Sequence, residues 1–558
     1  MKQKLCIALA LGAALAFSSC SKKLGQFNAD YFRTNPNPLE VVGQNVPATV
    51  TGNIPAKFFV KNASVTVTPY LVFGDKEVVS QPYTFQGQNV RGNAPVVSWD
   101  NGGTVTIPVN YVYQPEMAQS DLQLAFTVNQ GNKEYVLPRV SVAKGVVGTA
   151  ALADAGSVNP ALAPDAFQRI INEKYAADIL FLINKANIRA DQLKTDAMKE
   201  LQNEIENTAL NDRRVLKEIN IKSYASPDGP WAFNNELAQD REDVTKGYVN
   251  DQLKKDKIQE FNDLTAQFTP EDWEGLQKLV SQSNIQDKEL ILSTLSMYKD
   301  PEQREEELRN LINVFDVLAD QILPQLRYSR ITASIDVVGK SDSEINEAFD
   351  KNAKSLSNDE LLYAATLTED PARQEAIYRQ ATLLFPNDYR GWNDLGMMLY
   401  KNGDYAAAKD AFAKAAKLAA GASEPQMNLG LAELVNGNFA NANKYFGSAA
   451  GQKGLADALG VYYLKQGDNA AAVRAFGDSK TNNAAIAQIL TKDYSKAKAT
   501  LDGVAKANAL TYYLKAIVGA RTNNQSMVAS NLAEACKLDP KYAAMAAKDL
   551  EFAGFNVK

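Results

Sequence analysis

The 558 residues of this chain include no histidine, so cysteine is the most reactive side chain that remains. The absence of histidine excludes imidazole general bases, Ser-His-Asp and Cys-His arrangements, and the usual imidazole metal sites. The cysteines are Cys6, Cys20 and Cys536, and no CxxC pair occurs, which excludes thiolate zinc sites and dithiol redox sites. We therefore expect neither a metal nor a cofactor.

Composition and motif content also argue against catalysis and against nucleic-acid binding. Apolar residues form 45% of the chain, and 59 basic against 65 acidic residues give a net charge of −6, which provides no electrostatic footprint for nucleic acid. The sequence contains no Gly-x-Ser-x-Gly, no phosphate-binding loop and no carboxylate pair in a supporting context. A glycan hydrolase that uses two carboxylates needs no histidine and stays open as an alternative. We predict a protein that is not an enzyme.

Cys20 ends a segment that has the features of an export signal. Two lysines near the start precede an apolar run over residues 6–17, which is too short to span a hydrocarbon core of ~30 Å. Residues 17–20 (FSSC) resemble the lipobox of bacterial lipoproteins. The resemblance implies a signal peptide over residues 1–19 and acylation of Cys20. The alternative is a plain secretory signal that happens to end at a cysteine.

The residue after Cys20 is serine rather than aspartate. By analogy with that lipoprotein family, serine at this position favours the outer membrane, and we expect a lipid anchor there, on the periplasmic face rather than the cell surface.

Two further segments precede the candidate binding sites. Residues 20–40 are polar and contain an Asn-Pro-Asn-Pro run at 35–38, which predicts an extended tether. Residues 41–150 contain short β-branched and alternating runs, such as 63–73 and 104–113, and predict an antiparallel β-sandwich of immunoglobulin-like size. The sandwich is either a spacer or a sugar- or protein-binding surface, and no residue cluster identifies one.

Candidate ligand-binding residues gather in residues 165–345. The segment 223–244 (SYASPDGPWAFNNELAQDREDV) resembles the motif of OmpA-like peptidoglycan-associated domains, with Gly229, Asn234, Leu237 and Arg241 at matching spacings. The resemblance implies an α+β domain. The helical spacing between the arginine helix and the last strand predicts a helical insertion at about 252–326.

In the OmpA-like family, an aspartate and an arginine clamp the zwitterionic end of diaminopimelate in the peptidoglycan stem. A bidentate guanidinium–carboxylate contact and a carboxylate–ammonium contact supply the binding. Here Ser226 occupies the aspartate position and Asp228 follows two residues later, so the candidates are Ser226, Asp228, Asn234 and Arg241. The structural alternatives are a surface ion pair for Arg241, a helix N-cap for Asn234 and a turn at Asp228.

Residues 355–545 repeat with a period of 34. A Leu-Gly pair, a glycine, an alanine and a phenylalanine recur at fixed offsets, the phenylalanines being Phe412, Phe446 and, after a shorter unit, Phe476. We expect the small residues to let the first helix of a unit approach the second, and the phenylalanines to fill the gap between helix pairs. The pattern resembles tetratricopeptide repeats, which implies an α-solenoid of about six units that binds peptides or protein segments on its concave face. Polar residues on the first helix of each unit are the candidates for partner binding, and solvent exposure is the alternative for each: Asn393, Asn428 and Tyr463.

We thus predict a multidomain fold: an N-terminal β-sandwich, an α+β OmpA-like domain with a helical insertion, and a C-terminal α-solenoid of tetratricopeptide repeats. The predicted function is that of a lipid-anchored envelope lipoprotein, without enzymatic activity, that holds envelope proteins as a scaffold in outer-membrane assembly or organisation. The alternative is a peptidoglycan-tethering protein that binds peptide stems through the OmpA-like domain.

Overall fold

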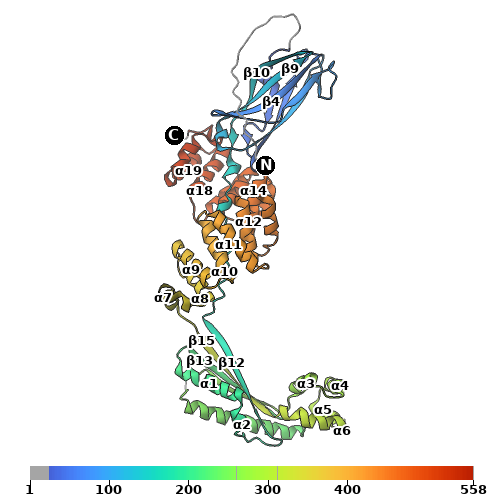
Figure 1. Ribbon diagram of the computed structural model, residues 1–558, viewed down its shortest axis with the longest axis vertical. Helices are drawn as coiled ribbons and strands as arrows, with labels where there is room; N and C mark the ends of the chain where they lie inside the picture. The colour runs from blue at the N-terminus through green and yellow to red at the C-terminus, as the bar shows by residue number, and fades with distance from the viewer. Residues whose placement is uncertain (1–23, 259–260, 311, 557–558) are drawn as a thin grey trace. The chain divides into compact units, whose positions relative to one another are not determined.

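The computed structural model describes residues 24–258, 261–310 and 312–556 and divides into two compact units (Figure 1). The first unit joins the residues up to Pro164 with those from Asp370 onward, and the second unit spans Asp165–Glu369. The predicted signal peptide and Cys20 lie outside the described residues. In the ranges described, no helix has the length and apolar character needed to cross a membrane.

The N-terminal part of the first unit is a sandwich of two sheets. One sheet has the order β1-β3-β8, and the other has the order β10-β9-β4-β6-β7 with β5 paired to β4. The short strands of the second sheet are β5 (Lys76–Val79), β6 (Tyr83–Gly87) and β7 (Val96–Val97). The main strands are β1 (Phe32–Asn35), β3 (Asn45–Ile54), β4 (Ala63–Phe73), β8 (Gly103–Val112), β9 (Ser120–Gln130) and β10 (Lys133–Lys144). Alternate residues point inward, so Val50 and Ile107 of one sheet share a core with Val67, Leu124 and Phe126 of the other.

The tether predicted for residues 20–40 is wrong over residues 24–40. Leu24 and Phe27 are buried in the sandwich core, and the ring of Phe27 stacks on Phe126 with centroids 4.3 Å apart. β1 pairs with β3, and β2 (Leu39–Glu40) pairs with β11 (Val146–Val147). The segment is polar on average, but burial of a few large apolar side chains, worth roughly 1.5–3 kcal/mol each, is enough to fix it.

A four-stranded sheet forms the centre of the second unit. Its order is β12-β15-β13-β14, and β14 runs parallel to β13 while the other pairs are antiparallel. The strands are β12 (Ile170–Leu180), β13 (Arg214–Tyr224), β14 (Asp263–Thr269) and β15 (Tyr328–Val338). Helices α1 (Asp196–Leu210) and α2 (Trp231–Lys255) pack on one face of this sheet, where Ile219, Ile221 and Ile331 form the core with Met198 and Val249 (Figure 1).

The insertion expected to be helical over about 252–326 is wrong in its first part. Residues 263–269 form β14, which extends the sheet, and its alternating polar sequence gives only a weak strand signal. The remainder is helical: α3 (Trp273–Gln282), α4 (Lys288–Met297), α5 (Pro301–Asn310), α6 (Ile312–Gln321) and the 3-10 turn η6 (Leu323–Leu326). These helices have their own small core, which includes Leu276, Ile291, Leu308 and Leu318.

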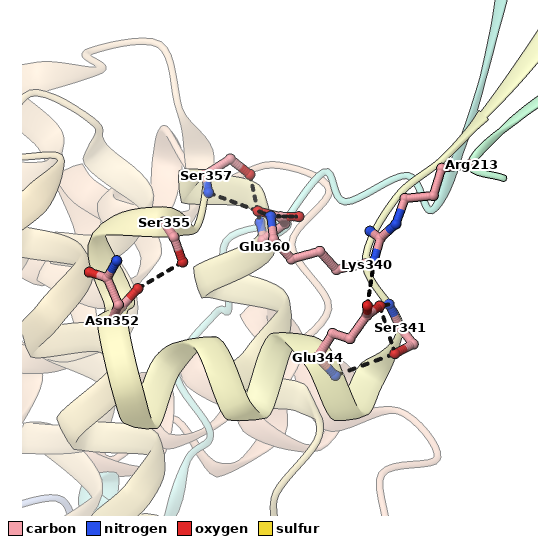
Figure 2. A network of polar contacts seen from close by, with 8 residues as sticks. All are labelled: Arg213, Lys340, Ser341, Glu344, Asn352, Ser355, Ser357 and Glu360. Atoms are coloured by element: carbon pink, nitrogen blue, oxygen red, sulfur yellow. Dashed lines mark hydrogen bonds and ion pairs between the residues drawn. The ribbon is translucent and has the colours of Figure 1, made fainter. Parts of the chain in front are cut away.

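Helices α7 (Asp342–Asn352) and α8 (Asn358–Thr366) close the second unit (Figure 2). Capping boxes begin both helices, with Ser341 and Glu344 at α7 and Ser357 and Glu360 at α8.

Ion pairs join these two caps to a residue just before β13 and a residue just after β15. Arg213 binds Glu344, and the Nζ of Lys340 lies 2.9 Å from a carboxylate oxygen of Glu360 (Figure 2).

The start of the repeats predicted at residue 355 is wrong, because α8 belongs to the second unit and the first unit resumes at Asp370.

The C-terminal part of the first unit is a helical repeat. Five antiparallel helix pairs follow one another from α10 to α19, and α9 (Pro371–Leu384) packs against the first of them. The first helices of the pairs are α10 (Tyr389–Lys401), α12 (Ser423–Val435), α14 (Leu455–Gln466), α16 (Asn482–Leu490) and α18 (Ala509–Arg521). Their partners are α11 (Tyr405–Leu418), α13 (Phe439–Gly447), α15 (Asn469–Phe476), α17 (Tyr494–Asp502) and α19 (Gln525–Leu538).

The repeated Leu-Gly and Phe positions have the packing role expected from the sequence. A Cβ at Gly396 would lie 2.6 Å from the Phe412 ring, and Gly430 and Gly460 face Phe446 and Phe476 in the same way. The glycine thus admits the phenylalanine of the partner helix, which confirms this prediction.

Candidate functional site

The first helices of the repeat bind a segment of the chain itself. This segment, residues 149–164, which we call the strap, consists of the 3-10 turns η3 (Thr149–Leu152) and η4 (Ala155–Ser157) and of extended residues that reach Pro164. The strap contacts α10, α12, α14 and α16. Ala153, Ala155, Val158 and Ala163 are each no more than 5% exposed, so the strap is part of the core of the first unit.

Two buried asparagines bind the backbone of Ala161 in the strap. The Oδ1 of Asn428 accepts the N–H of Ala161 at 2.7 Å, and its Nδ2 donates to the carbonyl of Ala161 at 2.8 Å. The Nδ2 of Asn393 donates to the same carbonyl at 2.9 Å, and its Oδ1 accepts from Asn428 at 2.9 Å. The amide side chain of Asn428 thereby satisfies both backbone polar groups of one residue, as a neighbouring strand would.

The pattern continues at both ends of the strap. The carboxylate of Asp394 accepts the N–H of Ala163 at 2.9 Å. The Oδ1 of Asn483 accepts the N–H of Asp154 at 2.9 Å, and its Nδ2 donates to the carbonyl of Asp154 at 2.8 Å. We call Asn393, Asp394, Asn428 and Asn483 the ladder.

The ladder binds mainly backbone groups, and one strap side chain is also bound, because Asn483 donates to the Ser157 hydroxyl at 3.0 Å. Of the strap residues that it contacts, Ala161 and Ala163 have only a methyl group, and Asp154 is bound through its main chain. Close approach of the strap also needs a glycine beneath it, because a Cβ at Gly454 would lie 3.1 Å from the carbonyl oxygen of Asn159. The surface is suited to an extended segment with small side chains.

The three predicted partner-binding residues have different outcomes. Asn393 and Asn428 lie together on adjacent first helices, but each is fully buried and its amide is bound to the strap. Tyr463 of α14 is half-buried, and its ring packs edge-on against Tyr462 with centroids 5.4 Å apart. Sequence reasoning missed Asp394, although it adjoins Asn393. It also missed Asn483, because the unit that contains α16 is shortened and falls out of the 34-residue period.

Asp394 makes the first unit sensitive to pH. Its complete burial raises the pKa of the carboxyl to about 7, although the N–H of Ala163 and the amide of Asn393 favour the charged form. The folded protein therefore keeps a proton that the unfolded chain loses above about pH 4, so stability falls as the pH rises from 4 to 7 and then levels off. We expect Asp394→Asn, which keeps the acceptor, to remove this component, which is on the order of 4 kcal/mol. Denaturant unfolding of wild type and variant across this pH range measures it, and equal slopes for both proteins would contradict it.

The second group of candidates lies around the start of α2. Arg241 is fully buried, and its guanidinium donates to the carbonyls of Lys185 at 3.1 Å, Tyr224 at 2.8 Å and Leu182 at 3.2 Å. Burial first, and then nearby Arg327, lower the pKa of Arg241 to about 10, while Asp228 opposes the change. This arginine joins α2 to two loops of the sheet, and a bound carboxylate could not reach it without unfolding these contacts.

The other residues of this motif are also paired within the chain. Ser226 donates to Asp228 at 2.7 Å, and Arg327 binds both, donating to the Ser226 hydroxyl at 3.0 Å and lying 2.6 Å from the Asp228 carboxylate. Asp228 thus has a cationic partner already. The sequence does bring Ser226, Asp228, Asn234 and Arg241 into one neighbourhood, but it gives no signal for Arg327, which comes from residues just before β15.

Asn234 connects this loop to the helical insertion. Its Nδ2 donates to the carbonyls of Ser226 and Gly229 and to a carboxylate oxygen of Glu271 at 2.9 Å. The N-cap expected for Asn234 is wrong, because α2 begins three residues earlier at Trp231. Asn234 instead fixes the 226–229 loop from inside the first turn.

The buried carboxyl groups of Glu271 and Glu305 form a pair beside Asn234, which donates to Glu271. Burial first, and then the neighbouring Glu271, raise the pKa of Glu305 to about 9. Since the folded pKa exceeds the ordinary value of 4.5, the stability of the second unit falls as the pH rises from about 4.5 to about 9 and then levels off.

We expect Glu305→Gln to remove this pH dependence of stability. The fluorescence of Trp273 reports the ionisation of Glu305, because the indole N–H donates to the neighbouring Glu271 at 3.0 Å. The change in Trp273 fluorescence between pH 7 and 10 should disappear in the variant, with Trp273→Phe identifying the signal. A change that persists in Glu305→Gln would contradict the assignment.

No cluster of three or more histidine, cysteine, aspartate or glutamate side chains is placed to hold a metal in the described ranges. Cys536 is a free, half-buried thiol.

Comparison with known proteins adds likenesses to helical-repeat structures. No protein-family model matches the chain, and no curated protein does. A chain of the APC/C hetero-tetramer Cut9–Hcn1 matches at 17% identity and a TM-score of 0.33, covering 38% of this chain and 46% of that one. A tetratricopeptide repeat protein from Parabacteroides merdae matches at 11% identity and a TM-score of 0.31, covering 44% of this chain and 99% of that one. PilF of Pseudomonas aeruginosa matches at 14% identity and a TM-score of 0.29, covering 38% and 99%.

This chain therefore spans less than half of the Cut9–Hcn1 chain. The successive helix pairs and the 34-residue period of the C-terminal region show that it is a helical repeat.

Proposed function

We propose that this protein is a protein-interaction scaffold without enzymatic activity, and that its helical repeats are of the tetratricopeptide type. The observation that carries the proposal is the ladder: side chains on successive first helices hold an extended peptide by its backbone. A surface that binds one peptide segment in this way has the chemistry to bind others.

The proposal includes a place in the cell. The lipobox-like FSSC sequence at residues 17–20 supports an acylated Cys20, and serine at position 21 supports the outer membrane, with the periplasmic face favoured. From this anchor the protein would hold envelope proteins during outer-membrane assembly or organisation. Replacement of Cys20 with alanine should abolish labelling by palmitate and release the protein from the membrane fraction; labelling that persists would contradict the anchor.

The peptidoglycan-tethering alternative has no comparable observation in its favour. Its arginine is buried on three carbonyls, and Asp228 is already paired with Arg327. We propose instead that the OmpA-like motif has a structural role in the second unit.

Photocrosslinking in intact cells tests the scaffold. Probes placed at exposed positions of the second helices, such as Lys414 and Lys444, should capture reproducible envelope proteins, and a probe at Lys133 of the sandwich serves as the matched control. If the repeat positions capture nothing beyond the Lys133 background, the scaffold proposal fails.

A further inference from the structure

The strap lies where a partner peptide would bind. Six of its backbone groups bind side chains of the repeat: the N–H groups of Asp154, Ala161 and Ala163 and the carbonyls of Asp154, Ala155 and Ala161. The side chain that binds Ala155 is the buried Tyr400 of α10, whose hydroxyl donates at 2.8 Å. A second peptide cannot use these groups while the strap is in place.

The chemistry of the occupant follows from the residues it presents. The sequence of residues 153–164 is ADAGSVNPALAP, which is rich in alanine and proline and has no aromatic side chain. Val158 and Pro160 are buried, whereas Leu162 is 48% exposed. Proline favours the extended backbone that the ladder requires. The carbonyl of Asn159 makes the close approach at Gly454 through main-chain atoms alone.

We propose that the ladder is a binding groove for an extended, alanine- and proline-rich segment of a partner protein, and that the strap occupies this groove as its competitor in cis. A partner segment binds only when the strap is withdrawn. This inference rests on the proposed scaffold function, because it names the chemistry of the partner and the step that controls access.

Competition in cis has a quantitative consequence. A tethered segment acts at an effective concentration in the millimolar range, so a free peptide with similar contacts is excluded at micromolar concentration. The apparent dissociation constant equals the intrinsic value divided by the fraction of molecules in which the groove is open. Any change that weakens the strap without altering the ladder should therefore strengthen peptide binding.

The test uses the full chain and a fluorescent peptide with the sequence of residues 150–165. In the variant Ala161→Pro, Ala163→Pro, the strap lacks the N–H groups that Asn428 and Asp394 accept, while the ladder is unchanged. We expect fluorescence anisotropy to show at least about tenfold tighter peptide binding to this variant than to the intact chain. Leu162→Pro is the matched control, because no described group accepts the Leu162 N–H, and it should bind like the intact chain.

A second variant covers the case in which the double proline variant does not fold. A protease site inserted between Pro164 and Asp165 allows one end of the strap to be released after folding, with every strap residue intact. Cleavage should also tighten peptide binding, and Asn428→Ala in the cleaved protein should abolish it.

Peptide affinity that is unchanged in both the proline variant and the cleaved protein would overturn the inference. So would binding that survives Asn428→Ala. Either result leaves the crosslinking test of the scaffold independent, because partners captured by the second helices of the repeat need no open groove.

Discussion

Replacement of Asn428 with alanine is expected to release the strap from the repeat. The change leaves the N–H of the half-buried Ala161 and the Oδ1 of the fully buried Asn393 without their partners. Each buried polar group left unsatisfied costs roughly 1–3 kcal/mol, so we expect a loss of about 2–4 kcal/mol in the stability of the first unit. Cleavage of the strap beside Val158 or Leu162 under native conditions should accelerate by roughly 30-fold or more.

Limited proteolysis followed by mass spectrometry measures this effect. Asn443→Ala is the matched control, since Asn443 is an exposed asparagine on α13 and its replacement should leave strap cleavage unchanged. Equal cleavage rates for Asn428→Ala and Asn443→Ala would show that Asn428 does not hold the strap.

Replacement of Arg241 with leucine is expected to destabilise the second unit severely. The leucine cannot donate, so the carbonyls of Leu182, Lys185 and Tyr224 lose their common partner. The expected cost is about 3–5 kcal/mol, and Arg241→Lys should also destabilise, because one ammonium lacks the planar fork that reaches three acceptors. Hydrogen exchange of α2 and of the 182–186 loop measures the loss.

The control for Arg241 is Arg213→Leu. Arg213 is half-exposed and pairs with Glu344 at the surface, where an ion pair is worth no more than about 1 kcal/mol. The peptidoglycan-clamp interpretation expects the opposite pattern for Arg241→Leu: an unchanged fold and loss of binding to sacculi. A variant with native exchange rates in α2 would therefore contradict the structural role of Arg241.

The sequence predicts the repeat well because its signal is local. The 34-residue period places Phe412 and Phe446 opposite small residues, and Gly396 and Gly430 face them as expected. The same period places Asp394 and Asn428 at equivalent positions, 34 residues apart, and Asn393 is the residue before Asp394. What occupies these asparagines cannot be predicted in this way, because Ala161 is more than two hundred residues away in the chain and contributes only backbone atoms.

The second unit shows the same limit. The motif spacing correctly gathers Ser226, Asp228, Asn234 and Arg241, yet the exposure that a binding role needs depends on distant residues. Arg327 comes from about a hundred residues later and binds Asp228. The tether prediction is wrong for a different reason: composition averages over a segment, whereas the individual side chains of Leu24 and Phe27 are buried and fix its end in the sandwich core.

Hydrogen exchange in the intact, full-length protein tests occupancy of the repeat by the strap most directly. The amides of Asp154, Ala161 and Ala163 donate to Asn483, Asn428 and Asp394, so we expect them to exchange as slowly as the core amides of α10 and α12. Exchange of these three amides at the rate of an unstructured peptide, while α10 and α12 remain protected, would contradict the bound strap and everything inferred from it.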